Sequence, residues 1–287
     1  MYDSLSVLNA FFRSIDTVTA GGAAKVSDTF TGIRNRFEQV TAVSETAAIG
    51  KLSDFVLEGS GKKPLDVENL VTLALGEVAA DAQARAEVRQ RVAGQVLATL
   101  RSEYKETSAE ANLVRLGDVL TEAAENLESA VQLCDPDLIP ERVIAIEDNE
   151  QRKAWNDAPR LNFLVEEALT SLAAAAELLG IQPTSENLFH LVVDATHLER
   201  KRPVFTVWDG ECGRAGRFAA LLQMGARIAP VESLEEFRNR AAEQGRPGPL
   251  ETRYVRGTDG FGGSRPITVD PDSPDYEEQV ALSYTVL

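Results

Sequence analysis

The stretch with the richest set of reactive side chains is residues 208–217, with the sequence WDGECGRAGR. A β-rich segment, residues 204–208, leads into it and predicts a strand, while residues 214–225 predict a helix. A cysteine at a helix N-terminus gains thiolate character, and glycines beside arginines let N–H groups and guanidiniums face an anion. The candidate anion-binding residues are Cys212, Gly213, Arg214 and Arg217.

The order of a cysteine, glycines and an arginine in this stretch is similar to the phosphate loop of cysteine-based phosphatases. Four residues separate Cys212 from Arg217, and that family uses a longer spacing. Neither the activity nor its site is therefore carried over. The stretch equally fits an ordinary strand-to-helix turn whose glycines supply backbone geometry. No catalytic residue is predicted.

Three other clusters offer ligand atoms without a matching pattern. Residues 259–264 are glycine-rich but lack the Lys-Ser/Thr pair of a P-loop, so a hairpin connection is expected. His190 and His197 lie near one face of a predicted helix, yet with the two cysteines they match no zinc spacing. Residues 270–275 carry three carboxylates without EF-hand spacing, which favours a solvated turn. We predict no metal and no cofactor.

The region before these clusters is predicted to be helical, because residues 1–135 contain a single proline, Pro64. The first two helices are separated at Gly21-Gly22. Each carries apolar residues at alternating spacings of three and four, which is an a/d seam. Such a narrow seam packs against a partner helix of the same chain or of another. The seam residues are Leu5, Leu8, Phe12, Ile15, Val26, Phe30, Ile33, Phe37 and Val40.

The most regular pattern lies in residues 113–130, between a polar break at Thr107-Ser108 and a stop at Asp135-Pro136. Apolar residues recur there every three or four positions, which predicts an amphipathic helix. Its outer face is acidic and is typical of a solvated surface. The acidic face consists of Glu122, Glu125 and Glu128.

Further helices complete the region up to about residue 200. They are expected from Val67, capped by Asp66, then at residues 88–104, at 161–180 with Gly180 as the C′ glycine, and from Thr184 or Ser185 to about 198. Residues 143–146 fit either a short strand or a helical turn.

The character of the chain changes after residue 200. Ser233 and Glu236 form a capping box that opens a helix ending near Gly245. Additional strands are expected at residues 252–255, 267–270 and 280–286.

The predicted fold is therefore mainly α, with an N-terminal helical bundle or coiled-coil-like region followed by a small C-terminal α/β module. Three domains are expected: residues 1–60 as a helical hairpin for oligomerisation, 61–200 as an acidic helical bundle, and 201–287 as the α/β module.

The net charge of −16 comes from 29 basic and 45 acidic residues, and residues 61–200 alone carry 13 basic and 25 acidic ones. Nucleic-acid binding needs clustered lysines and arginines, so none is expected. Without an 18-residue apolar run or a basic-apolar leader, neither a transmembrane segment nor a signal peptide is predicted. Two cysteines favour a reducing setting, in the cytoplasm or within a soluble assembly.

These patterns favour a non-catalytic structural or assembly subunit of a larger complex, such as a virion, that uses its helical seams to bind protein partners. The partners would form a homo-oligomer or a multi-subunit assembly. The first alternative is an anion-binding module or thiol-dependent enzyme centred on Cys212, Arg214 and Arg217. The second is an acidic adaptor or inhibitor that docks on a basic partner.

Overall fold

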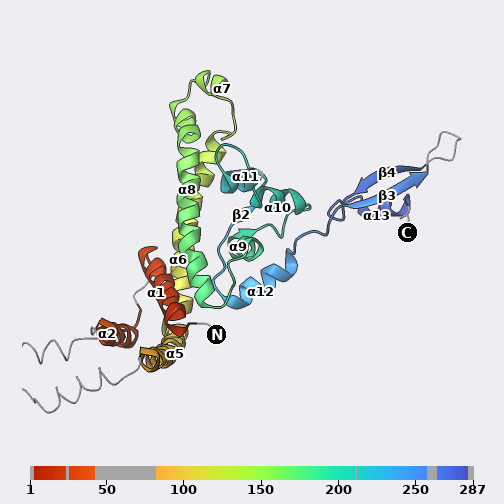
Figure 1. The fold of residues 1–287 in the computed structure, drawn as a ribbon. Helices are drawn as coiled ribbons and strands as arrows, with labels where there is room; N and C mark the ends of the chain where they lie inside the picture. The colour runs from red at the N-terminus through yellow and green to blue at the C-terminus, as the bar shows by residue number, and fades with distance from the viewer. Residues whose placement is uncertain (1–2, 24–25, 43–81, 211, 257–263, 284–287) are drawn as a thin grey trace, which may run out of the picture. The chain divides into compact units, whose positions relative to one another are not determined.

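The computed structural model of the 287-residue chain describes residues 3–23, 26–42, 82–210, 212–256 and 264–283 (Figure 1). The fold is mainly α with a small α/β part, as predicted. The longer helices are α1 (Ser4–Ala20), α2 (Asp28–Ala42), α5 (Ala82–Thr107), α6 (Ala109–Leu133) and α8 (Asn149–Leu178). The shorter ones are α7 (Pro140–Ile144), α9 (Ser185–Val192), α10 (Arg202–Trp208), α11 (Arg217–Gln223), α12 (Leu234–Glu243) and α13 (Tyr276–Ala281).

The described strands form two small antiparallel sheets. Strand β1 (Val193–Asp194) pairs with β2 (Arg227–Ile228), and Val193 faces Ile228. Strand β3 (Glu251–Arg256) pairs with β4 (Ser264–Val269). The strands predicted at residues 252–255 and 267–270 are therefore confirmed.

The chain divides into two compact units, residues 1–16 with 24–109, and residues 17–23 with 110–287. The boundary predicted near residue 60 lies outside the described residues, as does the helix predicted from Val67. The boundary predicted near residue 200 falls inside the second unit. The reason is a continuous core, in which Val192 and Phe205 belong to one buried cluster.

The first unit is built around an aromatic cluster. The Phe11 ring lies 6.1 Å from the ring of Phe30 in α2 and 6.5 Å from the ring of Tyr104 in α5. Of the seam residues, Leu8, Phe12, Ile15, Phe30 and Phe37 are buried, Leu5, Val26 and Ile33 are half-buried, and the side chain of Val40 lies outside the described part. Because the Phe12 and Phe37 rings lie 6.4 Å apart, the seams of α1 and α2 pack within one chain.

The second unit is built on α6 and α8, which α7 connects (Figure 1). Helices α6 and α8 contribute to one buried cluster, through Leu113, Leu116, Leu120 and Leu127 from α6 and Val165, Leu169 and Leu172 from α8. The Trp208 ring packs edge to face on Phe189 of α9 and on Phe218 of α11, at 5.6 and 5.8 Å. Opposite this core, Glu122, Glu125 and Glu128 are exposed, so the amphipathic pattern of α6 is confirmed.

Two predicted strands were wrong. Residues 204–208 belong to the helix α10, and Val280 belongs to α13, while residues 284–286 lie outside the described part. Helix α10 begins at Arg202-Pro203, where proline is tolerated because a first-turn N–H has no helical partner. Its β-rich residues are buried in the core, so packing overrides their strand propensity.

Three helix ends illustrate what local sequence fixes. The Oγ1 atom of Thr184 accepts the N–H of Asn187 at the start of α9, and Ser233 Oγ accepts the N–H of Glu236 in α12. Gly180 has φ +95° just after α8, as its predicted role requires. All three signals are confirmed. Helix α9, however, stops at Val192 instead of reaching residue 198, because the chain turns into β1. Of residues 143–146, Val143 and Ile144 end helix α7, and a turn hydrogen bond from the Ile146 N–H to the Val143 carbonyl follows, so the helical-turn alternative is confirmed.

Candidate functional site

The loop predicted to bind an anion contacts two carboxylates of its own chain. The backbone N–H of Arg214 donates to Asp137 Oδ1 at 2.9 Å. The guanidinium of Arg217 holds Glu166 in a bidentate pair, with Nε donating to Oε1 at 2.7 Å. A Cβ atom at Gly213 would collide with the Asp137 carboxylate, so glycine permits this approach. Both carboxylates belong to the chain itself, and binding of a separate anion stays a prediction.

Arg214 also donates a hydrogen bond to a backbone carbonyl of helix α8 that has no helical donor. Pro159 lies inside that helix and lacks the N–H that would bond to the carbonyl of Trp155, four residues earlier. The guanidinium of Arg214 donates to this carbonyl oxygen instead, and its Cζ lies 3.6 Å from the centre of the Trp155 ring. Helix α8 thus continues through Pro159 and begins at Asn149, after its Asp148 cap, although the sequence predicts a start at Leu161.

A double-mutant cycle tests this role of Arg214. We expect Arg214→Leu to lower the free energy of unfolding by about 1–3 kcal/mol, because the Trp155 carbonyl loses its donor. In a Pro159→Ala background the loss should be about 1 kcal/mol smaller, since alanine restores the helical N–H. Urea unfolding of the four proteins measures the coupling. Strictly additive losses would contradict the role.

The same loop fixes the start of α11. The Oδ1 atom of Asn162, a buried residue of α8, accepts the N–H groups of Phe218 and Ala219 at 2.9 and 3.4 Å. These are two of the amides that a helix start leaves without a helical partner. The Arg217 guanidinium lies 4.0 Å from the centre of the Trp208 ring. The candidate anion loop therefore joins α8, α10 and α11.

The two cysteines differ in environment. Cys212 is exposed, whereas Cys134 is buried, and burial raises the pKa of the Cys134 thiol. Arg214 and Arg217, which were predicted to face an anion beside Cys212, donate to carbonyl and carboxylate groups elsewhere in the chain. The strand expected before the cysteine is a helix. The geometry on which the thiol alternative was based is therefore not formed.

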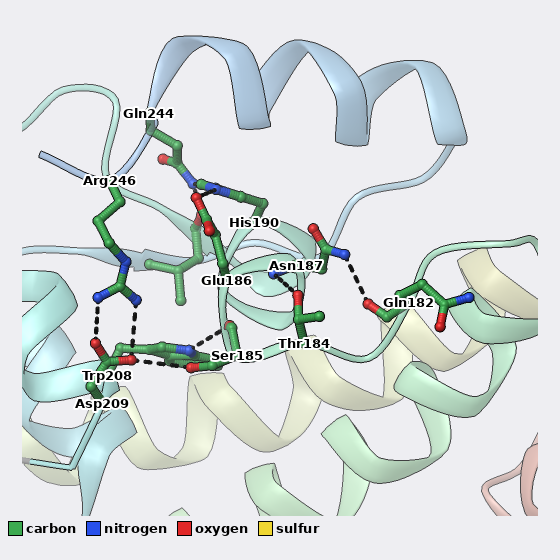
Figure 2. A network of polar contacts seen from close by, with 11 residues as sticks. Gln182, Thr184, Ser185, Glu186, Asn187, His190, Trp208, Asp209, Gln244 and Arg246 are labelled. Carbon is green, nitrogen blue, oxygen red and sulfur yellow. Dashed lines mark hydrogen bonds and ion pairs between the residues drawn. The ribbon is translucent and has the colours of Figure 1, made fainter. Parts of the chain in front are cut away.

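A second polar cluster surrounds His190 (Figure 2). His190 is 2% exposed, and its Nδ1 lies 3.4 Å from Nε2 of the fully buried Gln244. Gln244 also donates to the Val193 carbonyl at 2.6 Å and accepts the N–H of Ala195 at 2.9 Å. The amide of Gln244 thus fastens the end of α12 to α9 and β1.

The other half of this network is an ion pair beside Trp208 (Figure 2). Arg246 donates to both carboxylate oxygens of Asp209, and this contact lowers the Asp209 pKa. Ser185 Oγ donates to the same carboxylate at 3.1 Å, and the Trp208 indole N–H donates to the Ser185 carbonyl at 2.7 Å. These side chains bond to one another and connect α9 to the residues after α10 and α12.

The histidine and carboxylate clusters considered from the sequence have other surroundings in the structure than predicted. His197 is not on the helix of His190, because α9 ends first, and its Nε2 lies 2.9 Å from the Gly225 carbonyl. Across the described ranges, no three potential ligand side chains are grouped for a metal ion. Asp270 is not freely solvated, since it accepts from Arg200 at 3.0 Å and from Arg202 at 2.7 Å. The glycine-rich loop, residues 259–264, lies almost wholly outside the described part.

His190 should make stability depend on pH. Burial lowers its pKa below the usual value of about 6.5, Arg240 and Arg246 act in the same direction, and the Glu186 carboxylate, 3.8 Å from Nε2, opposes them. The unfolded chain therefore binds the proton more readily, and the free energy of unfolding should fall as the pH drops below about 6.5.

Urea unfolding between pH 7.5 and 5.5 measures this fall. We expect His190→Gln to remove most of the pH dependence in this window and His197→Gln, at the other histidine, to retain it. An unchanged slope in His190→Gln would show that other groups are responsible.

A surface groove is left open by the residues that the structure describes. It has a volume of about 840 Å³ and lies within the second unit, where the last turn of α1 meets α6 and α8. Its lining comprises Thr17, Ala20, Gly21, Val119, Glu122, Ala123, Asn126, Leu164, Glu167, Ala168, Thr170 and Ser171. Glu122 is the member of the predicted acidic face that takes part. The spacing of residues along a single helix could not predict the groove, because residues of α1, α6 and α8 line it together.

The lining of the groove combines apolar residues, called here its floor, with polar residues and two glutamates, one on α6 and one on α8. Leu164 is 39% exposed, which is high for a leucine, and the adjacent floor residues are small. Glu122 on α6 and Glu167 on α8 are both exposed. Such a surface can bury apolar groups at its base and attract positive charge at its rim.

No family model, curated protein or solved structure matches this chain. In the part of the chain that the structure describes, no helix has the length and apolar character needed to cross a membrane.

Proposed function

We propose that this chain is a non-catalytic subunit of a larger assembly and binds another protein through the groove between α6 and α8. The observation that carries the proposal is the groove itself, whose lining combines apolar residues with one glutamate on α6 and one on α8. Protein-binding sites commonly combine an apolar centre with a polar rim.

Two further observations support this choice among the functions considered from the sequence. In the candidate anion site, the backbone N–H of Arg214 donates to Asp137 and the guanidinium of Arg217 donates to Glu166, so both groups serve contacts within the chain. The seam of α1 packs against α2 of the same chain, as the contact between Phe12 and Phe37 illustrates. The groove, by contrast, keeps an exposed leucine at its floor.

Selection of displayed helical peptides on the full chain tests the proposal. The enriched peptides should bind wild-type protein at least tenfold more tightly than Ala168→Trp, because the large ring fills the groove. Ala242→Trp on the exposed surface of α12 is the matched control and should bind as wild type does. Enrichment of peptides that do not distinguish Ala168→Trp from wild type would overturn the assignment of the groove.

A further inference from the structure

We infer that the natural occupant of the groove is a basic amphipathic helix of another protein. This inference rests on the proposed function, because it names the chemistry of the partner at the same site. Three features of the groove lead to it: its charge, the helical nature of its walls and the size of its floor residues.

The charge of the groove comes from both walls. Glu122 stands on α6 and Glu167 on α8, both exposed, and neither carboxylate is in an ion pair with the residues that the structure describes. Helix α1 adds to this charge, since its last turn reaches the groove and carries no basic residue to offset its negative end. Lysines or arginines on both edges of a bound segment would complement these groups.

The walls favour a helix over an extended segment. An extended peptide leaves its backbone N–H and C=O groups in need of partners, which a sheet edge can provide. Here α6 and α8 satisfy their own backbone groups internally. A bound helix also forms its backbone hydrogen bonds internally, so its backbone groups need no partner from α6 or α8.

The floor also suits a helix. Ala20, Ala123 and Ala168 are small and allow a close approach, while Val119 and the exposed Leu164 offer apolar contacts. An amphipathic helix meets such a floor with residues spaced three and four apart. The chain itself carries a net charge of −16, so repulsion disfavours a second copy as the partner.

Fluorescence anisotropy with the full chain and three labelled peptides tests the inference. The peptides are each about 18 residues long and share leucines at helical spacing. At all remaining positions the first carries Lys, the second Gln and the third Glu. At about 150 mM salt, where long-range attraction is screened, we expect the lysine peptide to bind at least tenfold more tightly than the glutamine peptide.

Two matched variants separate the groove from the overall charge. Glu122→Lys with Glu167→Lys changes the walls, whereas Glu125→Lys with Glu177→Lys makes the same charge change at exposed positions outside the lining. The first pair should weaken binding of the lysine peptide about tenfold and the second less than about threefold. Circular dichroism verifies that both variants remain folded.

Each other outcome overturns the inference in a distinct way. Equal weakening by the two pairs would mean that the peptide responds to net charge alone. The glutamine or glutamate peptide could bind as tightly as the lysine peptide, with Ala168→Trp abolishing the binding of each. The groove would then bind a helix without preference for basic residues, and the proposed function would stand. If no peptide distinguishes wild type from Ala168→Trp, both proposals fail. A stable dimer by light scattering that Ala168→Trp dissociates would identify a second copy as the occupant.

Discussion

Replacing Trp208 with alanine is expected to lower the free energy of unfolding by about 3–5 kcal/mol, the largest effect of any single substitution considered for this chain. Trp208 is 2% exposed and packs on Phe189 and Phe218. Its indole N–H donates to the Ser185 carbonyl, and the guanidinium of Arg217 stacks on its ring. The truncation would remove contacts with both α9 and α11 and leave a cavity between these helices and α10.

Urea unfolding followed by far-ultraviolet circular dichroism measures this loss without depending on the tryptophan signal. Trp208→Phe is the matched control, because it keeps an aromatic ring and loses the hydrogen bond, and it should cost about 1–2 kcal/mol. Trp155 is half-buried and also stacks on an arginine, so Trp155→Ala should be milder. A loss below about 1.5 kcal/mol for Trp208→Ala would contradict the placement of α10 in the core.

Asn162→Leu should have the second-largest effect, a loss of about 2–4 kcal/mol. Leucine fills a similar volume but cannot accept the N–H groups of Phe218 and Ala219. The cost combines a lost helix cap, about 1 kcal/mol, with a buried donor left without a partner, about 1–3 kcal/mol.

Asn162→Asp distinguishes the cap from simple packing. An aspartate has the same shape, keeps the accepting oxygen and places negative charge at a helix N-terminus, so the loss should stay below about 1 kcal/mol. Equal losses for the leucine and aspartate variants, measured by the same unfolding experiment, would mean that the Oδ1 contact is not what Asn162 contributes.

Features set by neighbouring residues were predictable from the sequence. The caps at Thr184 and Ser233 and the glycine at Gly180 depend on the residues next to them, and the structure has all three. The apolar spacing of α6 likewise fixes its buried and exposed faces. An apolar seam, in contrast, predicts that a helix packs against another helix but does not identify that helix. The sequence therefore left open whether α1 packs against a helix of the same chain or of another chain.

What could not be predicted depends on residues far apart in the chain. Arg214 meets the carboxylate of Asp137 across 77 positions, and Arg217 meets Glu166 across 51. A local pattern therefore predicted an anion site but could not show that carboxylates of the same chain contact these residues. The strand propensity of residues 204–208 failed for the same reason, because burial in the core determines their conformation.

The most direct test of the central claim is amide hydrogen exchange of the full chain with and without a peptide selected on it. We expect slower exchange on binding in residues 119–126 of α6 and 164–171 of α8, with residues 212–217 unchanged, because the partner lies in the groove and the arginine loop serves packing alone. Protection confined to residues 212–217, or to the seam of α1 and α2, would contradict the claim.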